Sequence, residues 1–378
     1  MSIVNEKTIY DPIHGYIHMS GNCLNIIDSV YFKRLQNIKQ TGLLYYVFPG
    51  ANHNRFEHSL GVAHLAEKLM KNLRDKQPLL KITDRIIDIV KIAALCHDLG
   101  HGPFSHSFDN EFINQCKHIK NREHEIRSCN MVKLLWKKGF IDLSEIEVNC
   151  VCEMINPINE KLKTFYLYEI VANKNHGIDV DKFDYLLRDA YHIGLDHHFD
   201  SSRFLDCAHV IDGRLCYHKC CIPIMSNLFN LRYNLHMNIY NHHAVKSIEF
   251  MVCDMLIILD KWENISEKVD NDLFWTLDDN IVDHALYVYR KNIIDNIQYQ
   301  QDMSKVNVLW NRLKERDLYK TEYNMSLENI RGNYVNHYLN ITKGDDQIYK
   351  VPLYINENNY FYLEKDRKLD TILTIIKE

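Results

Sequence analysis

An apolar helical stretch that ends in a cluster of polar side chains, residues 91–106 (KIAALCHDLGHGPFSH), constrains this chain more than any other segment. Adjacent His97 and Asp98 close the apolar run, and His101 and His106 follow. Neighbouring imidazole and carboxylate groups can bind one metal as mixed nitrogen and oxygen ligands. A lone His–Asp pair is more often a core histidine beside a capping carboxylate. Four such groups at one helix end need partners if they are buried, which favours a site.

Periodic apolar residues predict a mainly helical chain. With 46% hydrophobic and 25% charged residues, the composition is that of an ordinary globular protein, and few glycines and prolines (13 and 7 of 378 residues) favour long helices. The predicted helices cover residues 22–40, about 58–76, 82–98, 124–137, 144–155, 177–189, 225–260 (one or two helices) and 281–318. A β-hairpin is expected over residues 209–217, and a short aromatic strand or turn over residues 43–50.

The last part of the chain has a different pattern. From about residue 340, two β-like runs separated by Asn-Glu-Asn-Asn predict a strand–turn–strand unit, and a helix is predicted over residues 367–377. A length of 378 residues favours one to three domains. We therefore expect a helical core over residues 1–330 and a small C-terminal α+β segment over residues 331–378 that packs on this core.

Charge and cysteine content narrow the classes of partner. The formal net charge of −5 gives no global attraction to nucleic acid. The first residues lack the apolar stretch of a signal peptide, and no run reaches the roughly 18 apolar residues of a membrane span. Eleven cysteines without a secretory signal favour reduced thiols. We therefore expect an intracellular protein, cytoplasmic or nuclear, without a membrane partner. Its many Asn, Ile, Lys and Tyr residues are compatible with a viral protein in a host cell.

Residues from distant parts of the sequence are candidate ligands for one metal. They are His58, His97, Asp98 and Asp181. Two imidazoles and two carboxylates would form a mixed site suited to iron, manganese or zinc. Such a site leaves positions for water and for a phosphate oxygen. The metal would lower the pKa of the water and polarise the phosphorus.

Other polar side chains suit a phosphate ester. The imidazoles suited to proton transfer are His101, His106 and His124. The cations suited to a polyphosphate are Arg55, Lys182 and Arg232. The predicted helices over residues 177–189 and 225–260 carry polar faces that mix Asp, Tyr, His and Arg. Such faces either lie in solvent or line a pocket, and the residues leave both alternatives open.

Other chemistries have weaker support. No G-x-S-x-G nucleophile elbow is present, and Cys96 falls on the buried side of its helix. The run Cys216-Tyr-His-Lys-Cys220-Cys221 resembles part of a zinc cluster but lacks a second ligand pair, so packing is favoured. The basic stretch 117–127 is interrupted by two glutamates, which favours a solvated face over a nucleic-acid site.

Five stretches carry a family resemblance. They are DPIHGYI (11–17), YYVFPGANHNRFEHSLGV (45–62), LCHDLGHGPFSHSFD (95–109), YEIVANK (168–174) and GIDVDKFDYLLRDA (177–190). Through them the chain resembles the HD-superfamily phosphohydrolases. The resemblance is closest to the deoxynucleoside triphosphate (dNTP) triphosphohydrolases that join a sterile-alpha-motif domain to an HD domain. The match spans about residues 7–250, with a weaker one at 316–320, and no sterile-alpha-motif domain is expected here.

The resemblance implies an all-helical HD core and a role for each candidate residue. The implied metal ligands are His58, His97, Asp98 and Asp181. The residues implied around the α-phosphate are His101, His106 and His124, with Asp109 orienting His106 as the proton donor. The implied triphosphate ligands are Arg55, Lys182, Tyr185 and Arg232. At the sugar, Gln40 and Asp189 would meet the 3′-hydroxyl, and Tyr240 would stack and disfavour a 2′-hydroxyl.

The implied reaction is hydrolysis of a dNTP at the α-phosphorus to deoxynucleoside and inorganic triphosphate, with Mg²⁺ accompanying the triphosphate. Thr41 and Asn241 depart from the family pattern at the sugar and base end. The sequence therefore constrains the identity of the substrate less than it constrains the type of reaction. The alternatives are an HD phosphohydrolase for another nucleotide, and a non-catalytic module that binds nucleic acid or a host protein.

The resemblance also implies a homo-oligomer, dimer or tetramer, in which GTP binds between subunits. The matching guanine-site positions are Lys7, Asp28, Arg316 and Lys320, whereas Lys33 and Gln36 differ. At a second activator site the family's basic positions are His218, Cys220 and His243, which lack a fixed positive charge. We therefore expect weak or absent nucleotide-driven tetramer assembly, unless Lys219 and Lys246 supply the missing charge.

Overall fold

The computed structural model describes residues 6–158, 165–196, 199–291, 295–320, 350–356 and 359–362. Its α-helices are α1 (Gly21–Asp28), α2 (Val30–Lys33), α3 (Arg55–Lys76), α4 (Asp84–Cys96), α5 (His124–Lys137), α6 (Glu145–Ile155), α7 (Val180–Ile193), α8 (Ser201–Asp206), α9 (Ile222–Asn234), α10 (His243–Glu263), α11 (Ile265–Val269), α12 (Ile281–Lys291) and α13 (Ile297–Lys314). Short 3₁₀ or π turns are η1 (Arg34–Asn37), η2 (Gly42–Tyr46), η3 (Pro78–Leu80), η4 (Phe108–Ile113), η5 (Tyr166–Glu169), η6 (Lys219–Cys221), η7 (Leu235–Tyr240) and η8 (Phe274–Thr276). The predicted, mainly helical fold is confirmed.

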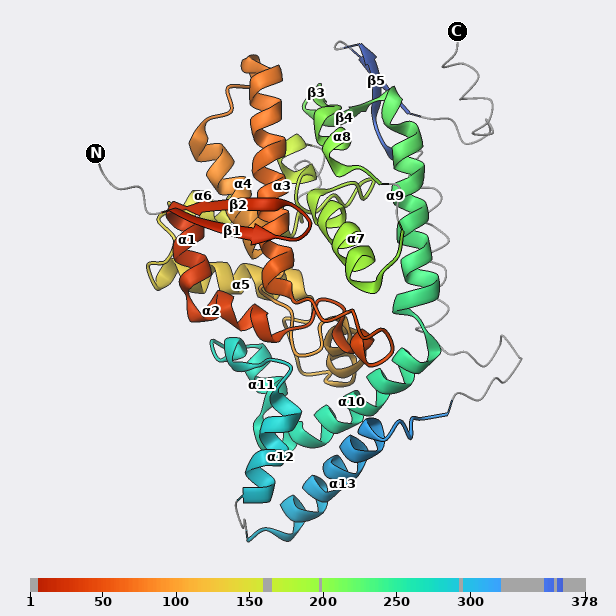
Figure 1. Cartoon of the computed structure of the whole chain (residues 1–378). Coiled ribbons are helices and arrows are strands. Elements are labelled where there is room, and N and C mark those ends of the chain that lie inside the picture. Colours follow the sequence, from red (N-terminus) through yellow and green to blue (C-terminus); the bar gives the residue numbers. More distant parts are fainter. Residues whose placement is uncertain are drawn as a thin grey trace.

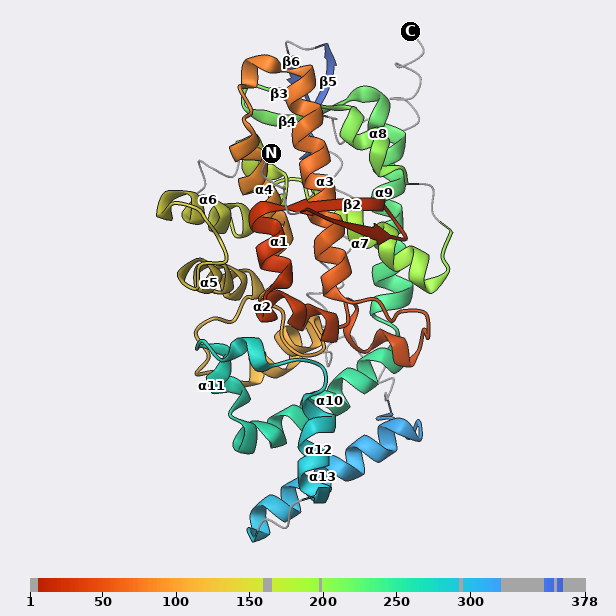
Figure 2. The ribbon, with the colours of Figure 1, turned by 60° about the vertical axis from the view of Figure 1, so that its left-hand side comes forward.

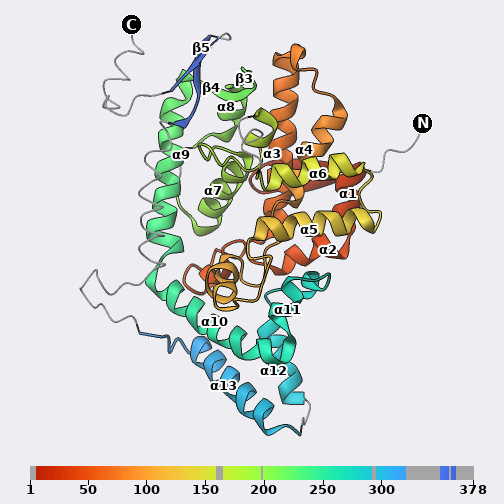
Figure 3. The ribbon, with the colours of Figure 1, turned by 180° about the vertical axis from the view of Figure 1, so that it is seen from behind.

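Two central helices, α3 and α4, pack side by side and both contribute buried apolar side chains to the core (Figures 1 and 2). Helix α3 begins at a capping box: the Asn54 side chain accepts from the Glu57 amide at 3.2 Å, and the Glu57 carboxylate accepts from the Asn54 amide at 2.9 Å. Helix α7 packs on α3, while α10 to α13 form a separate group at the other end of the molecule (Figure 3). The chain therefore brings the first turn of α3, the end of α4 and the first turn of α7 together.

Three predicted elements differ in detail. Residues 22–40 form α1, α2 and η1, because Ser29 ends α1 with a hydroxyl bond to the Ile26 carbonyl (2.6 Å) and caps α2 at the Phe32 amide (3.2 Å). Residues 43–50 contain the 3₁₀ turn η2 and no strand. Residues 281–318, predicted to be helical throughout, contain α12 and α13, and residues 295–296 before α13 are not helical. The one or two helices predicted over 225–260 are present as α9 and α10, joined by the π turn η7, with His242 capping α10. The helix predicted over 367–377 lies outside the described residues.

Two small sheets complete the described structure. Strands β1 (Glu6–Asp11) and β2 (Gly15–Ser20) form an antiparallel hairpin that crosses α3 and α4 (Figure 1). Strands β3 (Ala208–Ile211) and β4 (Arg214–His218) form the predicted second hairpin. Strand β5 (Leu353–Asn356) pairs with β4 in parallel, and β6 (Asn359–Phe361) pairs with β5. The proposed division at residue 330 stays a prediction.

Among the described helices, none has both the length and the apolar character needed to cross a lipid bilayer.

Gly61, in the middle of α3, generates a stability prediction. A Cβ atom there would lie 1.9 Å from the Asp184 Oδ1 atom and 2.6 Å from the Arg188 Nη2 atom. Gly to Ala in a helix ordinarily stabilises by about 1 kcal/mol. Here we expect Gly61→Ala to lower the free energy of unfolding by roughly 2–3 kcal/mol in urea denaturation, because the added methyl group displaces a buried ion pair. The control Asp75→Ala, at the exposed end of α3, should stay within about 0.5 kcal/mol of the parent. Equal or higher stability of Gly61→Ala would contradict this packing.

Candidate active site

The four predicted metal ligands converge on one point. His58 lies in the first turn of α3, His97 and Asp98 directly follow α4, and Asp181 lies in the first turn of α7. The His58 and His97 Nε2 atoms are 3.3 Å apart. Asp98 lies 3.4 Å from each of these nitrogens, and Asp181 Oδ1 lies 3.1 and 3.5 Å from them. Such separations are those of ligand atoms around a single ion.

The hydrogen bonds of both histidines fit a metal. The His97 Nδ1 atom lies 2.7 Å from the Ala94 carbonyl oxygen, which can only accept, so this nitrogen carries the proton. The His58 Nδ1 atom lies 2.7 Å from the Asp184 carboxylate, which fixes the same tautomer. Both Nε2 atoms then face each other at 3.3 Å, where a cation, either a proton or a metal ion, must lie between their lone pairs. The residues present therefore fit a bound metal.

The electrostatics of the cluster also favour a positive charge. Burial alone would raise the pKa of Asp98, but Arg55, His97 and His101 hold it well below its usual range. Burial alone would lower the pKa of His58, but Asp181 and Asp184 raise it to about 10. The carboxylates thus stay ionised, and the position between the imidazoles attracts a cation.

A second layer of buried charge supports the ligands and was missed by the sequence analysis. Asp184 on α7 accepts from Arg188 Nε (2.8 Å) and Nη2 (2.9 Å) and lies 2.6 Å from His14 Nε2. Arg188 also donates to Asp11 of β1 at 2.8 Å. An Asp–Arg pair four residues apart on the predicted helix over 177–189 was the available signal.

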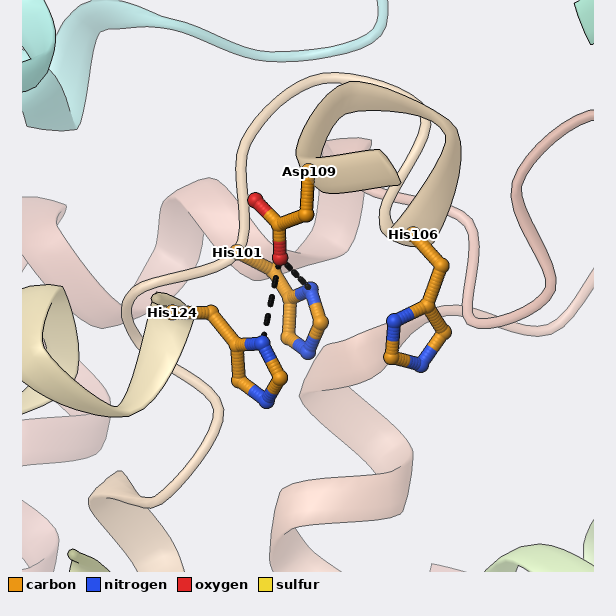
Figure 4. A group of neighbouring side chains, drawn as sticks. All are labelled: His101, His106, Asp109 and His124. Carbon is orange, nitrogen blue, oxygen red and sulfur yellow. Dashed lines mark hydrogen bonds and ion pairs between the residues drawn. The ribbon is translucent and has the colours of Figure 1, made fainter. Parts of the chain in front are cut away.

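Three histidines form a second cluster beside the metal ligands (Figure 4). The His101 and His124 rings stack with centroids 4.0 Å apart, and the His106 ring lies 4.9 Å from that of His101. His101 Nε2 is 3.3 Å from Asp98 Oδ1, so Asp98 belongs to both clusters. A group bound at the metal would therefore also meet the imidazoles.

Asp109, in the π turn η4, has different partners from those expected. Its Oδ2 atom lies 3.1 Å from His124 Nδ1 and 3.8 Å from His101 Nδ1, and Arg127 pairs with its other oxygen (Figure 4). No contact of this kind links Asp109 to His106 in the described residues. The structure therefore places Asp109 as the partner of His124, whereas the sequence analysis had assigned it to His106.

A cavity of about 450 Å³ opens over both clusters. The predicted site residues that line it are Gln40, Arg55, His97, Asp98, His101, His106, His124, Asp181, Lys182, Tyr185, Asp189, Arg232 and Tyr240. The described lining residues do not include His58 and Asp109, which lie behind the cavity wall. Thr41 and Asn241 also line it. The polar faces predicted on the helices over residues 177–189 and 225–260 therefore line a cavity. The sequence had left open whether these faces line a pocket or lie in solvent.

The predicted cations differ in how they are held. Arg55 is buried, and it pairs with Asp98 and donates to Ser105 (2.8 Å) and to the Gln40 carbonyl (3.1 Å). Lys182 lies 3.1 Å from Asp179. The buried Arg232 Nε has no hydrogen-bond partner among the described residues. Arg55 thus has fewer free donors for a phosphate than Arg232.

At the far side of the cavity the expected sugar ligands form their own network. Asp189 lies 2.6 Å from His53 Nε2 and accepts from the Tyr240 hydroxyl. Burial and the Asp189 charge raise the pKa of Tyr240 well above its usual value, so this hydroxyl stays protonated. The buried Gln40 Oε1 atom has no partner in the described part of the chain, and it remains available to a ligand.

Asp279 anchors two cavity loops and was also missed. Its carboxylate accepts from the Lys39 amide at 2.8 Å and from the Phe104 amide at 2.5 Å. Phe104 and Ser105 have φ values of +60° and +56°, which non-glycine residues rarely adopt. Asp279 thus stabilises a strained turn directly before His106.

The positions expected for GTP lie apart within one chain. Lys7 on β1 pairs with Asp28 at 2.6 Å, whereas Arg316, after α13, donates to the Tyr46 carbonyl at 2.5 Å. Strand β1 and helix α13 are distant in all three views of the chain (Figures 1 to 3). Lys320 is exposed near Arg316 in the sequence. Among the described residues, no hydrogen bond or ion pair joins Lys7 or Asp28 to Arg316 or Lys320.

Comparisons with known proteins agree with this geometry. The HD domain family matches residues 55–189. The Dictyostelium discoideum deoxynucleoside triphosphate triphosphohydrolase SAMHD1 homolog is 33% identical over 368 residues, which cover 96% of this chain and 70% of that protein. A putative HD domain-containing protein of Acanthamoeba polyphaga mimivirus is 36% identical and 72% covered. Human SAMHD1 is 39% identical over 74% of this chain, which spans about half (51%) of the human protein. The chain therefore belongs to the family of HD-domain proteins that includes SAMHD1 and its homologues.

Proposed function

We propose that the chain hydrolyses dNTPs to deoxynucleoside and inorganic triphosphate and so lowers dNTP pools. The observation that carries this proposal is the sharing of Asp98 between the candidate metal ligands and the histidine cluster, in a cavity that Arg55, Lys182 and Arg232 also line. A phosphoryl group seated there would touch both clusters at once. The names of the relatives, deoxynucleoside triphosphate triphosphohydrolases, support the substrate class.

The metal would be held by His58, His97, Asp98 and Asp181. Their mixed nitrogen and oxygen donors suit iron, manganese or zinc. When bound, such an ion would lower the pKa of a water ligand and polarise the phosphorus. Mg²⁺ would accompany the triphosphate.

The remaining steps fall to the protein's own side chains. Lys182, Tyr185 and Arg232 would bind the triphosphate oxygens, and Arg55 would do so with the donors that Asp98 and the loops leave free. His124, held by Asp109, and His101 would donate hydrogen bonds to the α-phosphate, His101 as a neutral imidazole because burial and Arg55 hold its pKa well below its usual value. His106 lines the cavity and would donate a proton to the leaving 5′-oxygen. Burial and the Arg55 charge lower the pKa of His106 to about 4 in the free protein, so the negative charge of the bound triphosphate would have to raise that pKa before His106 carries the proton.

At the sugar end, Gln40 and Asp189 would bind the 3′-hydroxyl. Gln40 offers its Oε1 atom, which has no hydrogen-bond partner among the described residues. Asp189 would give up its hydrogen bond to His53 or to Tyr240 and accept one from the sugar hydroxyl instead. The Tyr240 ring would pack against the sugar and disfavour a 2′-hydroxyl.

A product assay tests the proposal directly. Incubation of the metal-loaded protein with each dNTP, followed by chromatography, should yield deoxynucleoside and triphosphate in equal amounts. Asp98→Ala removes a ligand of the metal and should lose both the activity and the metal found by elemental analysis. Release of orthophosphate or of a nucleoside monophosphate would instead identify a different HD phosphohydrolase. Metal content equal to that of the parent in Asp98→Ala would refute the ligand assignment.

His106→Ala tests the proton donor. Loss of a general acid should lower kcat by about 100- to 10,000-fold while metal content stays unchanged. The exposed His118, outside the cavity lining, gives a matched control: His118→Ala should keep the parent rate. A loss below threefold in His106→Ala would remove His106 from this role.

Assembly is tested by light scattering with and without GTP and dNTP. We propose a homo-oligomer whose nucleotide-driven tetramer assembly is weak or absent. Lys246, the candidate replacement cation, lies 2.6 Å from the Glu249 carboxylate, which offsets its charge. We expect an unchanged mass and unchanged initial rates on nucleotide addition. A shift to tetramer with a matching rise in rate would show this part of the proposal to be wrong.

A further inference from the structure

Three cysteines that are separated in sequence meet at the edge of the second sheet. Cys207 directly follows α8, while Cys220 and Cys221 lie in the turn η6 after β4. Their sulfur atoms all lie within 4.8 Å of one another, and the Cys207 and Cys220 sulfurs are 3.7 Å apart. Sequence spacing had suggested only the Cys216–Cys221 run, because Cys207 reaches the others through the β3–β4 hairpin.

We propose that Cys207, Cys220 and Cys221 bind one thiophilic metal ion, Zn²⁺, at a site separate from the HD centre. Tetrahedral zinc with Zn–S bonds of about 2.3 Å places its sulfur ligands about 3.8 Å apart. The observed Cys207–Cys220 separation of 3.7 Å matches that edge. The third sulfur lies close enough to complete a face, which leaves a fourth position for water.

The surrounding backbone holds the thiols in place before any ion binds. The Cys207 amide donates to the Arg203 carbonyl at 3.0 Å, and its carbonyl accepts from the His218 amide at 3.0 Å. The His218 side chain accepts from the Cys220 amide at 3.3 Å, which fixes the turn. A preformed site loses little conformational freedom when it binds an ion.

The solvent exposure and the charge of the three cysteines favour ion binding over a role in packing alone. Cys221 is buried, but Cys207 and Cys220 are partly exposed, so an ion can enter from solvent. Three thiolates and one Zn²⁺ leave a net charge of −1. In the free protein, burial raises the pKa of Cys207 although Arg203 opposes this shift, so ion binding would release the thiol protons. Cysteines that serve only as small apolar side chains need no such neighbours.

Cobalt spectroscopy of the whole protein tests the site. After chelation and reduction, Co²⁺ titration should give a thiolate-to-metal charge-transfer band whose final intensity corresponds to one thiolate-bound ion per chain, while the HD site takes up a second ion without such a band, and Zn²⁺ should abolish it. The HD ligands are nitrogen and oxygen atoms, so the band reports only on the cysteine site. Cys207→Ser and Cys220→Ser should each weaken Co²⁺ binding by at least about 10- to 100-fold.

Two controls separate this site from the HD centre and from misfolding. Cys216→Ser, on β4 but outside the cysteine group, should keep the band. Asp98→Ala, which lacks an HD ligand, should keep it as well. Absence of a sulfur band in the parent, or an unchanged band in both cysteine variants, would overturn the proposal. A Cys207–Cys220 disulfide that persists under reductant would overturn it too.

Discussion

The arrangement of the active site depends on one buried carboxylate, that of Asp184. It receives hydrogen bonds or ion pairs from three segments: His14 after β1, His58 in α3, and Arg188 in α7. An unpaired charge at this depth would cost several kcal/mol, so these partners must all be present for the core to close. The candidate metal ligand His58 thus has its ring orientation set by the same carboxylate that contacts His14 of the N-terminal hairpin and Arg188 of α7. The Asp184 carboxylate fits against α3 because Gly61 has no side chain at the point of contact.

Much of the site could be predicted from the sequence, because its ligands lie at helix ends. The polar residues that interrupt the apolar run after Cys96 marked the end of the predicted helix over 82–98 and with it His97 and Asp98. His58 was expected at the start of the helix over about 58–76. The sequence left open whether these side chains meet in space. Only the pair that Asp184 forms with Arg188 was open to prediction, because the other partners of Asp184 and those of Asp279 lie more than one hundred residues away in the chain. The single helix predicted over 22–40 was wrong, because the Ser29 hydroxyl group ends α1 and caps α2.

The sequence also could not show that candidate ligands already hold one another. Arg55 is bound to Asp98, and Asp189 is bound to His53 and Tyr240. A side chain that is held in this way is positioned before substrate arrives, so less of the binding free energy is lost in ordering it. The same network means that a substrate must replace internal hydrogen bonds at the sugar end. Arg232 and Gln40 each keep an atom without a hydrogen-bond partner in the described residues, so a substrate can bind these atoms without breaking an internal hydrogen bond.

The parallel pairing of β4 with β5 has a consequence for synthesis of the protein. Strand β4 ends at His218 and β5 begins at Leu353, so about 135 residues separate the two partners. At ribosomal rates of about 5–20 residues per second, β4 stands as an open sheet edge for on the order of ten seconds. An open edge can pair with another nascent chain. The β3–β4 hairpin is therefore a region where nascent chains on neighbouring ribosomes can pair with each other before β5 is made.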